Sequence, residues 1–276
     1  MELYKNKEWL QYQLNNIKYA EKIGKLAGVS GDTITYWRKK FNIQKPDIKP
    51  QRKYSFDDTY FDNINNPVKS YWLGFIMADG CVSSSTSKKI ANRFSIVLKQ
   101  SDIDHLKKIA KDMKCHAPII TKEHIDKRGF TSYSCELRIN SQKLCNSLIK
   151  LGVIPNKTGK EQIPSSLDRK YYTDFIRGFF DGDGCLTKTL NRSYYRFHVG
   201  SCSEKIIKQI QLFLKEHGII IPTYIRNEYS KPFYMLETSC KKTCNDMLHL
   251  LYDNSETYLD RKYILVQDMF KICSLK

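Results

Sequence analysis

The sequence is short of acidic residues. Its 276 residues include 29 Asp and Glu against 46 Lys and Arg, which leaves a net charge of +17. The basic residues are spread along the whole length, which indicates a folded protein with a polyanionic partner. The 18 Tyr, 13 Phe and 3 Trp favour ordered structure. Nucleic acid is therefore the first candidate partner, and a basic surface without a specific partner is the alternative.

The sequence also lacks long apolar runs and metal-binding cysteine pairs. No stretch approaches the roughly 20 apolar residues of a membrane-spanning helix, and the opening MELYKNKEWL lacks the apolar core of a signal peptide. We expect no membrane partner and an intracellular, cytoplasmic protein encoded by a bacterium or phage, with an organelle as the alternative. The nine cysteines form no CxxC pair, and Cys240 and Cys244 have only His249 near them. Reduced thiols rather than a zinc site are expected.

The opening segment has the spacing of a helix-turn-helix. In AEKIGKLAGVSGDTITYWRKKFNI, apolar or small residues recur along two short segments separated by Gly28. Ser30 or Asp32 can cap the second helix, which would run to about Phe41. An ordinary helical hairpin is the alternative, since Gly24 stands where many such motifs carry Ala. The outward positions of the second helix suit phosphates and base edges in a major groove: Thr33, Thr35, Tyr36, Arg38 and Lys39.

The next stretch reads as a linker. NIQKPDIKPQRKYSFDD holds two prolines and four basic residues without an apolar period. We therefore expect a DNA-binding module over 1–44, a basic linker over 45–65, and a main region that divides into halves at 66–155 and 156–276.

The main region contains an internal repeat with the order α-β-β-α-β-β-α in each half. An α+β fold follows, with two antiparallel four-stranded sheets in tandem and approximate two-fold symmetry. The first half offers helices at about 68–80, 102–113 and 141–151 and strands near 81–86, 93–99, 117–124 and 130–139. The second offers helices at about 169–182, 203–217 and 240–252, strands near 185–189, 194–200, 223–229 and 233–239, and a final helix near 258–271.

The first helix of each half carries a shared motif. Both YWLGFIMADGCVSS and DFIRGFFDGDGCLT place Gly inside an apolar helix, at Gly74 and Gly178, with a small residue four positions later. An interior glycine costs about 1 kcal/mol relative to Ala, so close approach of two helix backbones is the expected compensation.

Pairing of these helices would bring two carboxylates together. Asp79 and Asp183 would face each other at the negative ends of two helix dipoles, where they need protons or cations. Hard oxygen ligands select Mg²⁺, which keeps room for water and phosphate. A lone Asp-Gly is more often only a helix-ending turn, but its duplication in matching structure favours a divalent-metal phosphodiesterase site.

The segments WLGFIMADG (72–80) and IRGFFDGDG (176–184) resemble the two motifs of a single-chain LAGLIDADG homing endonuclease, over about residues 66 to 271. The resemblance implies that the motif helices form the interface between the halves and that Asp79 and Asp183 bind Mg²⁺, with Mn²⁺ as a substitute. The carbonyl groups of Ala78 and Gly182 would be further ligands. The first motif departs from the pattern where Met77 stands in place of the acid that Asp181 supplies in the second.

The resemblance also implies a basic residue near the end of each half. Lys157 lies 78 positions after Asp79, and Lys262 lies 79 after Asp183. Such lysines can polarise an attacking water and stabilise charge on the phosphate. Coincidence among 46 basic residues is the alternative. A polar residue after the second strand is expected near the metals: Gln100 fits in the first half, and only Ser201 or Ser203 in the second.

The same resemblance implies that the two sheets form a saddle along the DNA major groove and that the chain cuts both strands as a site-specific endonuclease, which would promote mobility of its intron, intein or own gene. A monomer is expected because the duplication makes a second chain unnecessary. An intron RNA maturase and a non-catalytic DNA-binding regulator are the alternatives. Residues expected to contact DNA from the sheets are Arg93, Lys99, Arg138, Lys188, Arg192, Arg196, His198 and Arg226.

Overall fold

The computed structural model describes residues 2–46, 53–83, 92–188, 195–227 and 231–274. The chain divides into two compact units, Met1–Lys53 and Tyr54–Lys276, which are described separately. None of the described helices is both long and apolar enough to cross a membrane.

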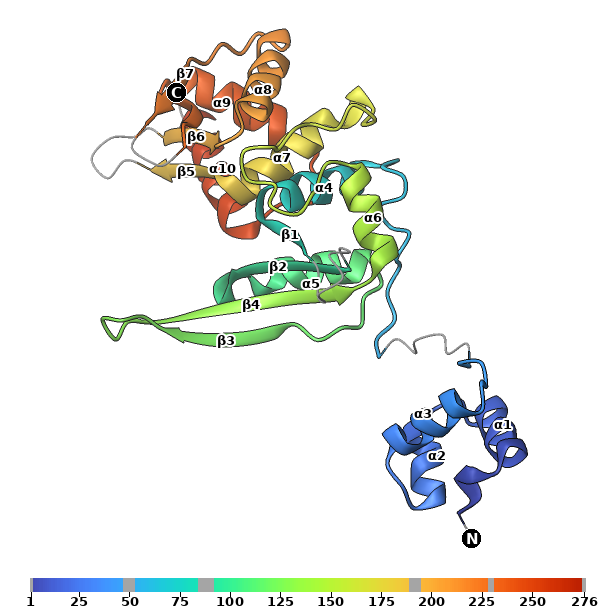
Figure 1. Cartoon of the computed structure of the whole chain (residues 1–276). Helices are drawn as coiled ribbons and strands as arrows, with labels where there is room; N and C mark the ends of the chain where they lie inside the picture. Colours follow the sequence, from blue (N-terminus) through green and yellow to red (C-terminus); the bar gives the residue numbers. More distant parts are fainter. Residues whose placement is uncertain (1, 47–52, 84–91, 189–194, 228–230, 275–276) are drawn as a thin grey trace. The chain divides into compact units, whose positions relative to one another are not determined.

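The N-terminal unit is a small bundle of helices (Figure 1). It contains a 3₁₀ turn (Leu3–Lys5) and helices α1 (Lys7–Asn16), α2 (Ala20–Ala27) and α3 (Gly31–Lys40). Helix α1 was not expected, but the boundary between the other two is as predicted: Gly28 ends α2 with a φ of 70°, and the Ser30 side chain caps α3 by accepting from the Thr33 amide. A methyl group at Gly24 would lie 2.6 Å from the Val29 carbonyl oxygen. Glycine is therefore required where the turn crosses α2. The buried core of this unit comprises Leu10, Leu14, Ile23, Ile34 and Ile43.

The main unit starts earlier than the expected residue 66. Tyr60 and Phe61 are buried in its core, and the amide of Asp57 donates to the Met113 carbonyl. Residues from Tyr54 onward therefore belong to the main unit.

The repeat order is confirmed. The first half contains α4 (Pro67–Asp79), β1 (Gly80–Ser83), β2 (Arg93–Lys99), α5 (Ile103–Asp112), β3 (Ile120–Ile125), β4 (Thr131–Asn140) and α6 (Gln142–Lys150). The second contains α7 (Tyr172–Asp183), β5 (Gly184–Lys188), β6 (Tyr195–Ser201), α8 (Glu204–Glu216), β7 (Thr223–Arg226), β8 (Phe233–Thr238) and α9 (Lys241–Tyr252), followed by α10 (Asp260–Ser274). Short 3₁₀ turns (Gln100–Asp102 and Arg169–Tyr171) precede α5 and α7.

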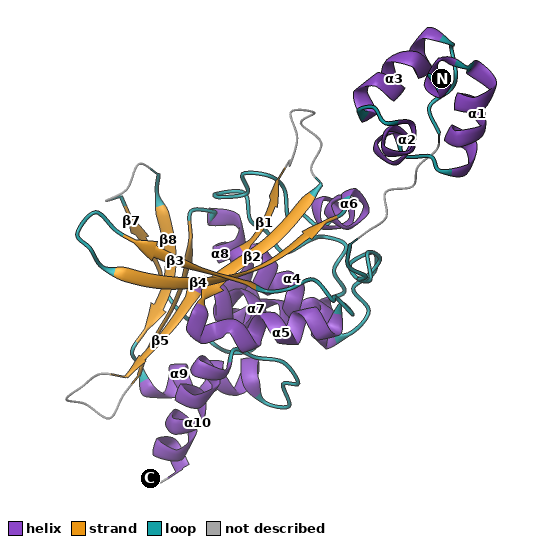
Figure 2. Ribbon diagram, turned by 90° about the horizontal axis from the view of Figure 1, so that it is seen from below, coloured by secondary structure: helices purple, strands orange, loops and turns teal. Residues whose placement is uncertain are grey.

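Both sheets have the same antiparallel topology. The strand orders are β1-β2-β4-β3 and β5-β6-β8-β7. In each half, the second strand along the chain is therefore hydrogen-bonded to the first and to the fourth. One face of each sheet packs on helices, as Figure 2 shows, because alternate residues are apolar and buried. In β4 these are Cys135, Leu137 and Ile139, and in β6 they are Tyr195, Phe197 and Val199. No described helix covers the opposite face, which is called the open face below.

Helices α4 and α7 pack against each other along their glycines. A methyl group at Gly74 would lie 1.9 Å from the carbonyl oxygen of Phe175, and one at Gly178 would lie 2.0 Å from that of Tyr71. No side chain fits in either place, so the two backbones are in direct contact. The expected compensation for interior glycine is confirmed: each half supplies one helix to a shared core.

A double substitution tests this packing. A methyl group at Gly182 would lie 2.4 Å from the Ala78 methyl carbon. Gly182→Ala is expected to destabilise the main unit by about 1 to 3 kcal/mol through overpacking. Ala78→Gly alone costs up to about 1 kcal/mol in helix propensity. The double variant should recover most of the stability, because the second change makes room for the first. Denaturant unfolding of all four proteins measures the coupling; strictly additive effects would contradict the close contact.

Candidate active site at the ends of the paired helices

Asp79 and Asp183 are the last residues of α4 and α7, and Gly80 and Gly184 follow each of them as the first residue of a strand. The position of Gly182 beside the Asp79 carboxylate shows how close the ends are: a methyl group there would lie 3.3 Å from Asp79 Oδ2. The sequence expectation that pairing brings the two acids together is therefore met by the geometry.

The two carboxylates are electrostatically unfavourable where they lie. Both side chains keep access to solvent, but the surrounding protein removes part of their hydration. This loss of hydration is the main cause that raises the pKa of Asp183 to about 7, and the charge of Asp79 adds to it. The pKa of Asp79 is raised for the same first reason, although Lys262 and Lys157 oppose the shift. A site that raises carboxylate pKa values favours a bound cation at neutral pH.

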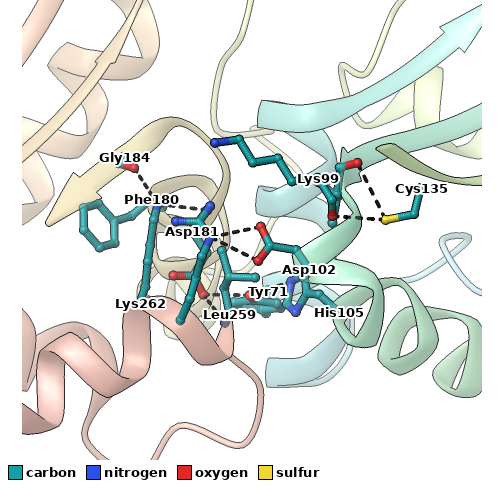
Figure 3. A network of polar contacts seen from close by, with 12 residues as sticks. Tyr71, Lys99, Asp102, His105, Cys135, Phe180, Asp181, Gly184, Leu259 and Lys262 are labelled. Carbon is teal, nitrogen blue, oxygen red and sulfur yellow. Dashed lines mark hydrogen bonds and ion pairs between the residues drawn. The ribbon is translucent and has the colours of Figure 1, made fainter. Parts of the chain in front are cut away.

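The predicted lysines both reach the ends of these helices. Lys157 Nζ donates to the Ala78 carbonyl at 2.6 Å, which is one of the two carbonyl groups predicted as a metal ligand. Lys262 Nζ donates to the carbonyl groups of Phe180, Asp181 (2.9 Å) and Gly184 (2.5 Å) (Figure 3). Lys262 is buried, and loss of hydration lowers its pKa to about 8. All three of its N–H donors are occupied, so it holds the end of α7 together. Among the described residues Lys157 makes one hydrogen bond, which leaves two of its N–H donors.

Asp181, at the sixth position of the second motif, is the centre of a buried network (Figure 3). Its carboxylate accepts from the hydroxyl groups of Tyr71 (2.7 Å) and Tyr252 (2.5 Å) and from the Leu259 amide (2.8 Å). The Tyr71 hydroxyl also lies 3.1 Å from His105 Nε2. Burial lowers the pKa of His105 to about 3, so this histidine is neutral. Asp181 therefore joins α7 to α4, to α9 and to the residue that precedes α10, and its role is structural.

An ion pair between the halves lies close to the acids. The Arg261 guanidinium donates through Nε to both carboxylate oxygens of Asp102, at 2.9 and 3.2 Å. Arg261 comes from α10 and Asp102 from the turn that precedes α5. The charge of Arg261 lowers the pKa of Asp79 and that of Asp102 raises it, so both groups lie near Asp79. Sequence reasoning missed this pair because its members are 159 residues apart.

The polar residues expected after the second strands differ between the halves. Gln100 is exposed at the end of β2. Ser201 and Ser203 are buried and bonded to Glu161: Ser201 Oγ lies 3.2 Å from Glu161 Oε2, and Ser203 Oγ donates to the Glu161 carbonyl at 2.6 Å. Neither serine is free to face the acids. Glu161, which the sequence did not single out, fastens the connection between the halves and also raises the pKa of Asp183.

The strand pairing shows which predicted DNA contacts share the open face. In the first half Arg93, Lys99 and Arg138 alternate with buried residues and lie on it. In the second half Arg196, His198 and Arg226 do so. Lys188 is paired with Tyr195 on the helix-covered side and ion-paired with Asp268 of α10 at 2.7 Å, so it does not lie on the open face. Arg192 lies outside the described residues.

In the N-terminal unit, some of the predicted DNA-contacting side chains on α3 make bonds within the unit, and others are exposed. Thr35 Oγ1 donates to the Gly31 carbonyl at 3.0 Å and Arg38 Nη1 to the Ile43 carbonyl at 3.0 Å, while Thr33 takes part in the helix cap. Tyr36 and Lys39 are exposed. Among the described residues, Lys39 makes no such local bond, and Tyr36 makes an edge-on ring contact with Trp37.

The comparisons with known families agree with this geometry. Residues 72–155 match the family model described as LAGLIDADG endonuclease, and residues 170–258 match that of the LAGLIDADG-like domain. Together the two matches span more than half of the chain. The chain belongs to the LAGLIDADG family. The resemblance found in the two motifs is confirmed, and α4 and α7 are its LAGLIDADG helices.

Solved structures of two homing endonucleases and a meganuclease are also similar to this chain. Mesophilic variants of I-DmoI have 15% identity and a TM-score of 0.45, over 71% of this chain and 92% of theirs. I-SmaMI bound to uncleavable DNA has 17% identity and a TM-score of 0.45, over 75% and 89%. I-WcaI bound to its DNA recognition sequence has 12% identity and a TM-score of 0.48, over 75% and 88%. No curated protein sequence matches the chain.

The pKa of Asp183 leads to a testable consequence. A carboxyl group with a folded pKa near 7 and an ordinary value of 3.8 stabilises the folded state most below pH 3.8, and this contribution is lost as the pH rises to 7. Asp183→Asn avoids this loss of stability at high pH, because an amide does not ionise. Without divalent cations at pH 8, we expect the variant to be more stable by about 1 kcal/mol, allowing for solvent screening, or roughly 2 to 4 °C in thermal midpoint.

At pH 4 the two proteins should melt together. Asp104→Asn is the control, because Asp104 is exposed and its pKa is lowered by the Lys107 side chain; it should show no gain at pH 8. Mg²⁺ at pH 8 should raise the midpoint of the wild type more than that of Asp183→Asn. A variant that is equally stable or less stable at pH 8 would show that Asp183 is not held against an unfavourable charge.

Proposed function

We propose that the chain is a metal-dependent, site-specific double-strand DNA homing endonuclease. The observation that carries the proposal is the meeting of Asp79 and Asp183 at the ends of two helices packed backbone to backbone. The open faces of the two sheets carry basic side chains, which suits a long DNA site read in the major groove. The activity would promote mobility of an intron, an intein or the gene itself, inside a cell and by a monomer.

The donor set fits a hard divalent cation. Asp79 and Asp183 would hold the metal, and the Gly182 carbonyl is a further candidate ligand. Among the described residues no group of three or more His, Cys, Asp or Glu is placed to bind a metal. Two carboxylates with open positions suit Mg²⁺, or Mn²⁺ in its place, because such ions keep water and phosphate oxygens as ligands. When bound, the ion would stabilise negative charge on the phosphate and its oxygens.

Side chains near the two acids would have separate roles in the reaction. Lys157, held by the Ala78 carbonyl, has N–H donors left to polarise an attacking water and stabilise charge on the phosphate. Lys262 fixes the end of α7 and so positions Asp183. The exposed Gln100 is the polar candidate of the first half, and no free counterpart lies among the described residues after β6. The protein groups around the two scissile phosphates, one on each DNA strand, would therefore differ.

Two other functions are compatible with the fold. An RNA maturase would use the same open faces to bind intron RNA, and a DNA-binding regulator would use them without cutting. The pairing of Asp79 and Asp183 argues against the regulator, because binding DNA without cutting it does not require two carboxylates that repel each other. Binding of intron RNA with equal or higher affinity than DNA would favour the first.

Cleavage of a defined DNA tests the proposal. The substrate is DNA that joins the sequences flanking the gene or its host intron, without the insertion. We expect double-strand cleavage with Mg²⁺ and none with EDTA. Asp79→Asn and Asp183→Asn should each lower the rate by about 100-fold or more while DNA binding persists in a gel-shift assay. Asp104→Asn is the matched control and should cut normally. Full cutting by either active-site variant would refute a shared site.

The N-terminal unit should extend the DNA footprint. It carries 12 Lys and Arg against 5 Asp and Glu in residues 1–53, and Tyr36 and Lys39 are exposed on α3. Deletion of residues 1–53 should shorten the protected DNA at one end, weaken binding, and make binding less sensitive to salt because phosphate contacts are lost. Tyr36→Ala with Lys39→Gln should reproduce part of this effect, and Gln11→Ala on α1 should not. An unchanged footprint would contradict a DNA-binding role.

A further inference from the structure

Among the described residues, each open face contains one carboxylate among its basic side chains. In the first half this is Glu136 of β4, whose side chain is only 5% exposed. The Arg138 guanidinium donates to it through Nε, 2.8 Å from Oε1, and through Nη2, which lies 2.7 Å from Oε1 and 2.9 Å from Oε2. Lys122 Nζ of β3 donates to Oε2 at 2.6 Å. The carboxylate is therefore surrounded by two cations that remain partly exposed themselves.

The second half has the same arrangement at a different position in the sheet. Arg196 Nε of β6 donates to Glu237 Oε1 of β8 at 2.6 Å, and Arg196 Nη2 also contacts this oxygen. Arg226 Nη2 of β7 lies 3.9 Å from Glu237 Oε2. Again one arginine is held through its Nε edge, and a second cation from the outer strand lies on the other oxygen.

The donors that remain on Arg138 point to a ligand. A guanidinium has five N–H donors, and Glu136 occupies those along the Nε edge. For the described part of the chain, no partner is recorded for Nη1. The end of the group therefore offers two parallel donors, from Nη1 and Nη2, in the geometry that matches guanine O6 and N7 in the major groove.

Stability and general DNA affinity do not explain the two glutamates. The side chains of Arg138 and Arg196 are 36% and 46% exposed, so solvent screening on the arginine side limits what these ion pairs contribute to folding. A negative charge on a DNA-binding face also opposes binding to phosphates. Fixing an arginine before DNA arrives does have a benefit, because it lowers the entropy lost on binding and restricts the directions in which the group can donate.

We propose that Glu136 and Glu237 are specificity-determining residues that hold Arg138 and Arg196 end-on, so that each arginine reads one guanine of the target site. This rests on the proposed function, since it requires that the open faces contact duplex DNA. The target would thus contain a guanine in each half, one read from β4 and the other from β6.

Selection from a random duplex library tests the proposal without a known target. The full-length protein is used, with Ca²⁺ in place of Mg²⁺, and bound DNA is sequenced. For Arg138→Ala we expect loss of a guanine preference at one position in one half of the site. Glu136→Gln should weaken the preference at that same position by at least about 5-fold, the lower end of the discrimination given by a bidentate contact, with overall affinity unchanged or higher.

Further variants separate positioning from charge. Arg138→Lys keeps the charge but lacks the planar fork, so it should lose the guanine preference as Arg138→Ala does. Glu237→Gln and Arg196→Ala should act on one position in the other half. Lys99→Ala, on the same open face, should lower affinity for all sequences alike.

Two outcomes would overturn the inference in distinguishable ways. If Glu136→Gln leaves every preference unchanged, or if Arg138→Ala weakens all sequences equally, the arginines contact phosphates and the glutamates only hold the strands together. If the wild-type protein enriches no duplex sequence, the proposed function itself fails and the inference fails with it. Thermal midpoints of the variants close to that of the wild type show that all are folded.

Discussion

The rest of the structure depends on direct backbone contact between α4 and α7. Glycine at two interior positions of these helices leaves no space for any other residue, since a methyl group would overlap the carbonyl oxygens of Phe175 and Tyr71. The same contact closes the core between the halves, sets the two sheets side by side in one unit, and brings Asp79 and Asp183 together. The loss of helix propensity at the glycines is thus linked to function, because a wider separation would leave two unrelated carboxylates.

The two halves share topology but differ in how their ends are secured. In the second half Asp181 accepts three hydrogen bonds, one of them from Tyr71 across the interface. The corresponding positions on the other side of the repeat are Met77 and Phe175, both buried and apolar. Lys262 is enclosed by three carbonyl groups, whereas Lys157 has one. A duplicated sequence has therefore kept its backbone pairing and the two terminal acids while replacing a polar network by apolar packing on one side.

Much of this could be predicted from the sequence, because the decisive signals are local. The duplicated glycine helices, the order of strands and helices, and the capped α3 follow from short-range patterns. What was missed depends on partners far along the chain. Lys188 was expected on the DNA-binding face, but its register places it beside Asp268. Ser201 and Ser203 were expected near the metals, but both are bonded to Glu161. Whether a polar side chain faces solvent or a buried partner depends on a one-residue register that periodicity alone does not set.

The central claim is that the paired helices create one shared cation site. Crystals of the protein soaked with Mn²⁺ and measured for anomalous scattering test it most directly, because the signal locates the ion without reference to activity. We predict anomalous density in contact with the carboxylates of both Asp79 and Asp183, lost in a crystal of the double Asn variant. Density at only one carboxylate, or none while Mn²⁺ binds elsewhere on the chain, would contradict the account.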